Sequence, residues 1–169
     1  TVILNAVTDP YVSGSNPRIA FTANPSTFKA LEVRADAGVV FNTNVTTTVG
    51  NFLVESDQNH TGESFDDTVM KGGTTLTAAG MLTIEQGLHI GFLSLGVTSG
   101  NASIIANGID LNGTLNHEGD GYEVTLAAGK GSLIVGGGIN APGNNLVLSG
   151  ATITTGTVTT SGTSSHYGG

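Results

Sequence analysis

The sequence predicts an all-β chain that folds as a parallel β-helix, a solenoid of about five to six irregular coils. Three observations support this class. The composition favours strands and tight turns, since 26 residues are Gly, many others are Thr, Ser or Asn, and only 11% are charged. One phrase of apolar and small residues recurs, and apolar and polar residues alternate within each copy. At 169 residues, the chain is long enough for one domain with its own core.

The repeated phrase contains an apolar pair at positions i and i+2, a small residue with Gly, a second apolar pair and a final apolar residue. Its copies lie in residues 31–45, 76–90, 104–115, 126–139 and 146–158. One slot of the phrase aligns Phe41, Ile84, Leu111, Val135 and Ile153, with steps of 43, 27, 24 and 18 residues. The first step fits two coils, with residues 51–54 as a weaker copy between them. Coils of this length are typical of solenoid repeats.

Each copy alternates in the way that a half-buried strand requires. Leu82 and Ile84 flank Thr83, and Ile109 and Leu111 flank Asp110. A period of two residues directs one set of side chains inward and the other into solvent. A single strand–turn–strand unit cannot bury its own apolar side. Stacked coils bury continuous apolar rows and pair the backbone groups of each coil with its neighbours.

An antiparallel β-sandwich is the alternative fold, because it also contains many short strands and turns. A sandwich does not require one phrase to recur, so the repeat favours the β-helix. Residues 1–29 do not fit the phrase, and Pro10, Pro17 and Pro25 predict an irregular N-terminal strand, a cap or a linker region there. Residues 30–169 are expected to form the β-helical repeat domain.

The charge balance limits the partners of the chain. Thirteen acidic and five basic residues give a formal net charge of −8. Nucleic acids and anionic membrane surfaces require clustered Lys and Arg, so neither is an expected partner. No apolar run approaches the roughly 18 residues of a membrane span. The absence of Cys excludes disulfides and thiolate metal sites, and a chain that begins with Thr is expected to be a mature or excised segment.

A metal site is considered in residues 55–67, where five carboxylates and His60 are concentrated. Calcium prefers several oxygen ligands from a turn, which makes Asp57, Asp66 and Asp67 candidate calcium ligands. No EF-hand spacing is present, and the favoured interpretation is a solvated loop between two coils. The second acidic cluster, at Glu118, Asp120 and Glu123, is interpreted in the same way as a hairpin-like excursion. No cofactor other than this calcium candidate is expected.

Catalysis is not expected from this sequence. A β-helix enzyme that acts on polysaccharides is an alternative function, and adjacent Asp66 and Asp67 resemble a general acid and base pair. Neighbouring residues of a strand point to opposite faces, however, so the two would act together only within a loop. The four His residues lack metal-ligand spacing, and no G-x-S-x-G motif occurs.

A ligand-binding or ice-binding solenoid is another alternative, suggested by the Thr-rich residues 46–48 and 152–160. An ice-binding ladder requires an outward Thr at the same slot of every coil. The positions beside Ile84 and Leu111 carry Glu85 and Asp110 instead. The sequence therefore favours Thr as an ordinary residue of exposed strands.

Residues 74–84, 102–115 and 124–135 resemble the surface repeats of bacterial filamentous-haemagglutinin-type and large β-strand-repeat adhesins. The similarity covers about residues 28–160. It implies a right-handed parallel β-helix that is secreted or displayed at the cell surface and serves in adhesion or as a filament shaft. That family has no catalytic residues to transfer. The chain departs from it in its uneven coil lengths and in its first 29 residues.

The C-terminal part of the chain indicates how it is used. Residues 131–169 contain no Asp, Glu, Lys or Arg. Natural proteins usually protect open strand edges with charge, Pro or a cap, so an uncharged end predicts that a further coil covers it. That coil belongs either to another module or subunit or to the continuation of a longer chain, and both indicate an elongated assembly. We therefore expect an extracellular, non-enzymatic structural or adhesive module that assembles end to end. Its expected partners are itself or neighbouring modules through strand stacking, with surface glycans as a further candidate.

Overall fold

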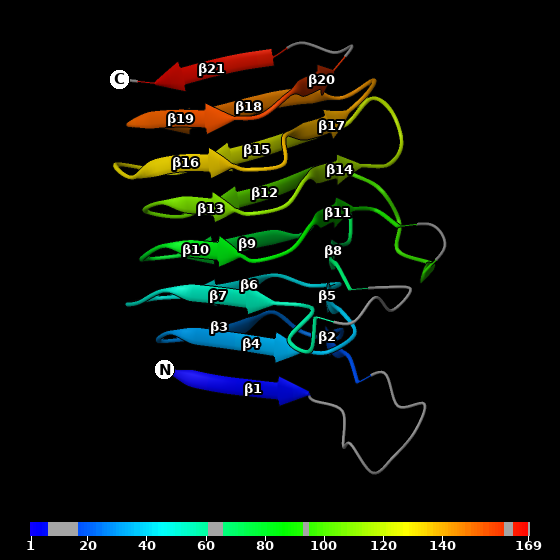
Figure 1. The fold of residues 1–169 in the computed structure, drawn as a ribbon, viewed down its shortest axis with the longest axis vertical. Coiled ribbons are helices and arrows are strands. Elements are labelled where there is room, and N and C mark those ends of the chain that lie inside the picture. Colours follow the sequence, from blue (N-terminus) through cyan, green and yellow to red (C-terminus); the bar gives the residue numbers. More distant parts are fainter. Residues whose placement is uncertain (7–16, 61–65, 93–94, 161–163, 169) are drawn as a thin grey trace.

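The computed structural model describes residues 1–6, 17–60, 66–92, 95–160 and 164–168. In these residues it contains 21 strands and no helix. The strands form three sheets of seven strands each, and the pairings within the sheets are parallel. The fold is therefore the predicted parallel β-helix (Figure 1).

The three sheets, here named A, B and C, each receive one strand from every coil. Sheet A contains β1 (Val2–Ala6), β4 (Leu31–Ala35), β7 (Phe52–Glu55), β10 (Leu82–Ile84), β13 (Ile109–Leu111), β16 (Ser132–Val135) and β19 (Thr152–Thr155). Sheet B contains β2 (Ile19–Phe21), β5 (Val39–Phe41), β8 (Thr68–Met70), β11 (Leu88–Ile90), β14 (Leu115–His117), β17 (Ile139–Ala141) and β20 (Val158–Thr160). Sheet C contains β3 (Ser26–Phe28), β6 (Val45–Thr47), β9 (Thr75–Ala78), β12 (Ala102–Ile105), β15 (Glu123–Ala127), β18 (Asn145–Gly150) and β21 (Ser164–Gly168).

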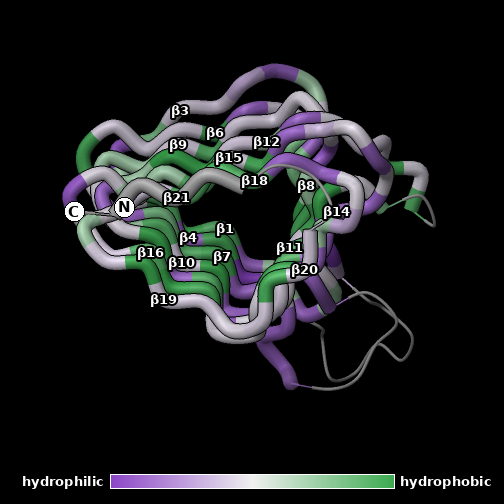
Figure 2. Tube along the Cα trace, turned by 90° about the horizontal axis from the view of Figure 1, so that it is seen from above, coloured by the Kyte–Doolittle hydropathy of each residue, from purple (hydrophilic) through white to green (hydrophobic). Residues whose placement is uncertain are grey.

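The coils wind in one direction. Figure 2 looks along the axis from above and shows the three sheets as three walls, through which the chain passes in the order A, B, C. The first coil lies at the bottom of Figure 1 and the last at the top, so the chain climbs toward the viewer of Figure 2 as it turns anticlockwise. This is a right-handed solenoid, the handedness that parallel strand connections almost always adopt.

The core consists of inward rows that run through all three sheets. In sheet A, Leu31, Phe52, Leu82, Ile109 and Leu133 pair from strand to strand, and all five are buried. A fully buried side chain of this size stabilises the fold by about 1.5–3 kcal/mol relative to an exposed one. These rows therefore supply the main driving force for stacking the coils.

The structure confirms part of the slot alignment and corrects the rest. Ile84, Leu111 and Val135 do occupy one row of sheet A. Ile153 is two residues out of this row, because it pairs with Leu133. Phe41 lies in sheet B and pairs with Met70, so its alignment with Ile84 was wrong. Each coil contains three similar strand phrases, and this similarity allowed a sheet B strand to be aligned with sheet A.

The stack has seven coils, compared with the five to six that were expected. The difference lies at the N-terminal end, where residues 1–29 contribute β1, β2 and β3 to the three sheets. These strands pair with β4, β5 and β6 of the second coil. Residues 7–16, which include Pro10, lie outside the described residues.

The corners between sheets are narrow and bring backbones into close contact. At Gly72, an added Cβ would lie 2.3 Å from the backbone nitrogen of Gly100, in the corner of the next coil. Asn side chains at other corners link successive coils: Asn44 Oδ1 accepts a hydrogen bond from the Thr75 N–H at 2.8 Å, and Asn101 Oδ1 accepts one from the Glu123 N–H at 2.9 Å. The repeated Gly and Asn residues of the sequence therefore set the tight stacking of the corners.

Candidate functional site

The three calcium candidates are not gathered into one site. Asp57 lies in the corner after β7, with its Oδ2 atom 3.9 Å from Nδ1 of His60. Asp67 precedes β8, and its Oδ2 atom lies 3.0 Å from Nε2 of His89. Asp66 is half-buried beside Asp67. Among the described residues, no three Asp, Glu or His side chains form a group that could hold a metal ion. Residues 61–65 lie outside the described residues, so the calcium site stays a prediction.

Of these three residues, Asp67 contacts the outer side of sheet B through His89. His89 points outward from β11, where its ring centroid lies 5.1 Å from that of Phe92. The carboxylate of Asp67 lies against Gly87, in the corner between β10 and β11 of the next coil. A Cβ at Gly87 would be 2.6 Å from Asp67 Oδ1. This arrangement places a carboxylate and an imidazole 3.0 Å apart on the surface of sheet B.

A loop between β11 and β12 covers part of this surface. Its residues Phe92, Leu95 and Val97 pack against Val40 and Val69, which point outward from β5 and β8. Phe92 and Val97 also form an isolated antiparallel bridge. The loop thus buries an outer apolar cluster that is separate from the main core. The phrase F-L-S-L-G at residues 92–96 was the sequence signal for it, but that phrase does not show which surface it covers.

The outer side of sheet A carries charged residues. Arg34 Nη1 lies 3.1 Å from Glu55 Oε2 on the neighbouring strand, and Arg34 Nε donates a hydrogen bond to Glu32. The hydrogen bond to Glu32 raises the pKa of Arg34 above its ordinary value, and the negative charges of Glu32 and Glu55 act in the same direction. This ion triplet neutralises Arg34 and leaves one net negative charge on this part of the sheet.

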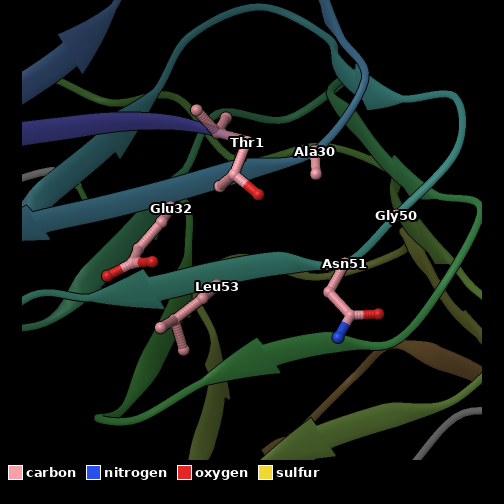
Figure 3. Close-up of a pocket in the computed structure, with 7 residues that line it drawn as sticks. Thr1, Ala30, Glu32, Gly50, Asn51 and Leu53 are labelled. Carbon is pink, nitrogen blue, oxygen red and sulfur yellow. The ribbon is translucent and has the colours of Figure 1, made fainter.

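A shallow hollow of about 420 Å³ lies beside this triplet, at the lower edge of sheet A (Figure 3). It is lined by Thr1, Ala30, Leu31, Glu32, Gly50, Asn51 and Leu53. The Glu32 carboxylate is already bonded to Arg34, and Asn51 Oδ1 accepts a hydrogen bond from the Met81 N–H at 3.0 Å. Glu32 is therefore held within its own strand, and Asn51 links two successive coils.

The second acidic cluster forms a short corner and no hairpin, which corrects the expected excursion. β14 ends at His117 and β15 begins at Glu123. The corner is fixed by Asn144 of the next coil, whose Nδ2 donates to the Gly119 carbonyl oxygen at 2.7 Å. Glu123 accepts a hydrogen bond from the Thr125 hydroxyl at 3.3 Å.

His117 is a buried residue that sequence reasoning did not identify. It follows Leu115 and Asn116 with the spacing of an inward position, and it is only 4% exposed. Its Nε2 atom lies 3.0 Å from the Gly100 carbonyl oxygen, and its ring centroid lies 5.8 Å from that of Tyr122. Its Nδ1 atom is buried with no hydrogen-bond partner among the described residues.

The two ends of the stack expose apolar residues of the inward rows. At the first coil, Val2 is 41% exposed, and Leu4, Ile19 and Phe28 are partly buried. At the last coil, Ile153 and Val158 are likewise only partly buried. These positions are fully covered in the middle of the stack, where a coil lies on each side.

The hydrogen-bond pattern shows in which direction the backbone N–H groups of the inward rows point. The N–H groups of Val2, Leu31, Phe52 and Leu82, which all belong to one inward row, donate to carbonyls of the following coil. By the same pattern, the N–H groups of Ile153 and Val158 point away from the coil below. The upper edge therefore presents backbone donors and acceptors in the arrangement of every internal coil.

The outer side of sheet C differs from the other two because two of its outward rows contain no charged residue, although Glu123 points outward at the start of β15. Thr27, Thr46 and Thr77 pair across β3, β6 and β9, and the row continues through Ile105 and Ala127. A second row contains Thr75, Ser103, Thr125 and Val147. The sequence argument against a Thr ladder used Glu85 and Asp110. Asp110 lies in β13 and Glu85 directly follows β10, so both lie on the sheet A side of the helix, and the argument does not apply to the outward positions of sheet C.

Comparisons with protein-family models, curated proteins and solved structures find no match to this chain. The described residues contain no helix long and apolar enough to cross a membrane.

Proposed function

We propose that this chain is a structural module of an extracellular filament or cell-surface adhesin, in which its coil ends stack on a second copy or on a neighbouring module. The observation that carries this proposal is the open inward row at both ends of the stack. Val2 and Ile153 belong to the row that is buried in every coil between them. A further coil placed on either end would bury them in the same way.

The residue types of the first and last coils favour stacking of a further coil on their strand edges over exposure of these edges to solvent. The strands β1, β2 and β3 of the first coil contain no charged residue, and neither do β19, β20 and β21 of the last. Exposed edges that remain solitary usually carry Lys, Pro or inward-pointing charges, because these block pairing. Such protection is absent from these six described strands, so their edges suit a further parallel strand.

The proposed role is mechanical. The length of the module is the sum of its coils, and the ladders of backbone hydrogen bonds between coils supply stiffness along the axis. Residues 74–84, 102–115 and 124–135 resemble adhesin repeats. This resemblance supports the proposal that the module is part of an extracellular filament or adhesin. Catalysis has no part in the proposal.

The experiment compares two substitutions of Ile by Lys. Ile153→Lys places an ammonium in the half-exposed inward row of the last coil, where it reaches solvent in a single chain but is buried in a stack. Ile134→Lys adds the same charge on the outward side of β16, where Ile134 is 36% exposed. Sedimentation velocity and electron microscopy of the purified chain measure assembly.

We expect elongated assemblies of the original chain and of the Ile134→Lys variant, with lengths that increase with concentration. The Ile153→Lys variant should shift to monomers. Stable monomers of the original chain over the whole concentration range would contradict end-on stacking.

A further inference from the structure

We propose that the outer side of sheet C is an ice-binding face, which goes beyond the structural role above. The face is defined by two outward rows: Thr27, Thr46, Thr77, Ile105, Ala127 and Ser149 in the first, and Thr75, Ser103, Thr125 and Val147 in the second. None of these ten residues is charged, and none is buried.

The face has a regular two-dimensional spacing. Parallel pairing is continuous from β3 to β18, so each residue of a row lies directly above its neighbour. Neighbouring strands are about 4.8 Å apart, and positions i and i+2 of one strand are about 6.6 Å apart. Figure 1 shows that the strands keep nearly the same direction from coil to coil. The two rows therefore form a regular grid in which seven of the ten positions carry a hydroxyl. The hydroxyl ladder is unbroken through Thr27, Thr46 and Thr77 and through Thr75, Ser103 and Thr125, where Thr125 donates to Glu123, while Ile105, Ala127 and Val147 interrupt it toward the C-terminal coils.

The hydroxyls are accessible to an external partner. Thr46, Thr77 and Ser103 are half-exposed, and their hydroxyl groups have no hydrogen-bond partner among the described residues. Each carries its hydroxyl on a Cβ atom whose position is fixed by the strand, and Thr also holds a methyl group there. The loss of side-chain freedom on binding a rigid surface is therefore small.

The other two sides of the helix lack these properties. The outer side of sheet A carries Glu32, Arg34, Glu55 and Asp110 in its rows. The outer side of sheet B is covered in part by the loop that contains Phe92 and Leu95. In the described part of the chain, sheet C combines regular spacing and access with two rows that contain no charged residue, and Glu123 lies outside these rows at the start of β15.

The chemistry of the face selects the partner. A charged polymer would require several opposite charges, whereas among the described residues the single carboxylate on this side of the sheet is that of Glu123, beside the two rows. Sheets of crystalline polysaccharide are usually recognised by aromatic side chains, and the ten residues of the face include none. Ice is uncharged, extends in two dimensions and offers hydrogen-bonding groups at a fixed repeat. A rigid grid of hydroxyls and methyls that holds water in a similar repeat matches it.

The test compares Thr77→Lys in the centre of the face with Thr83→Lys in the centre of β10. Both Thr residues are half-exposed and point outward from the middle of a strand, but Thr83 belongs to sheet A. The strongly hydrated ammonium of Lys should disturb ordered water only where ice is bound. Circular dichroism melts of both variants monitor the fold, and thermal hysteresis and partition of the protein into a growing ice front measure binding.

We expect the original chain and the Thr83→Lys variant to enter the ice fraction and to produce thermal hysteresis. The Thr77→Lys variant should lose both activities while it melts at the same temperature as the Thr83→Lys variant. The proposal is overturned if the original chain stays in the liquid, if it binds crystalline chitin or cellulose but no ice, or if both variants lose activity equally.

Discussion

The Nε2 atom of His117 lies 3.0 Å from the carbonyl oxygen of Gly100 and anchors the loop between β11 and β12 to an inward position of sheet B. The equivalent position of the preceding coil is Ile90. A polar ring therefore occupies an inward position of the apolar core. Its Nε2 atom contacts Gly100, which lies at the end of the loop, just before β12. The other nitrogen, Nδ1, is buried without a partner among the described residues.

We predict that His117→Ala lowers the free energy of unfolding by about 2–4 kcal/mol, because it removes a buried ring and leaves a cavity. His117→Phe should cost less than His117→Ala, because it keeps an aromatic ring in the position and removes the unpartnered nitrogen, although the ring is larger and the bond to Gly100 is lost. Urea unfolding followed by circular dichroism measures both variants. Equal losses for Ala and Phe would show that the hydrogen bond, and not the ring volume, dominates.

Close backbone contact at the corners gives a second prediction. A Cβ at Gly113 would lie 2.6 Å from the backbone nitrogen of Gly87, whereas a Cβ at Gly156 would lie no closer than 3.2 Å to Gly138. Both glycines lie in corners between sheets A and B, and neither has a positive φ. Gly113→Ala should therefore destabilise the chain by about 1–3 kcal/mol, with a much smaller effect of Gly156→Ala. Thermal melts check the difference, and equal melting temperatures of the two variants would refute the tight corner.

The buried side chain of Asn144 gives a third prediction. Its Nδ2 donates to the Gly119 and Pro142 carbonyl oxygens at 2.7 and 2.9 Å, and its Oδ1 accepts from the Tyr122 N–H at 3.0 Å. Asn144→Ala leaves these groups without their partner and should lower the free energy of unfolding by about 2 kcal/mol or more.

Asn140 provides the matched control, because it is exposed and makes one side-chain hydrogen bond, to Asn116 Oδ1 at 3.3 Å. Asn140→Ala should change the stability by less than about 0.5 kcal/mol. Denaturant unfolding of the two variants decides the matter. A loss at position 144 no larger than that at position 140 would mean that the Asn144 bonds contribute little.

The fold could be predicted because the inward rows leave a clear period of two in the sequence. Leu82, Thr83 and Ile84 show the alternation, and parallel pairing with Ile109, Asp110 and Leu111 reproduces it one coil later. The sequence does not assign each strand to its sheet, since V-V-F at residues 39–41 resembles the phrases of sheet A. Only the pairing with Thr68 and Met70 places this strand in sheet B.

The surfaces could not be predicted to the same degree, because they depend on register over long separations. Thr46 and Thr77 are 31 residues apart, and their alignment requires the length of every intervening corner. The burial of His117 is hidden in the same way, since a lone His after Leu115 and Asn116 does not show which of its neighbours points inward. Local alternation predicts strands, whereas the faces of the solenoid follow from how the coils stack.

The most direct test of end-on stacking uses two single-cysteine variants of this cysteine-free chain. Ile3 and Thr154 lie at opposite ends of one outward row of sheet A, which passes through Thr83 and Asp110. If a second copy continues the stack in the same register, Ile3→Cys of one chain lies above Thr154→Cys of the other, within the Cα separation of about 4.4–6.8 Å that a disulfide requires.

A double variant with Thr83→Cys and Asp110→Cys, which pair on adjacent strands, is the intrachain control for oxidation. After mild oxidation, non-reducing electrophoresis should show a crosslinked dimer when the Ile3→Cys and Thr154→Cys chains are mixed, and little when either is alone. No crosslink in the mixture, or equal crosslinking of each variant with itself, would contradict head-to-tail stacking of the coils.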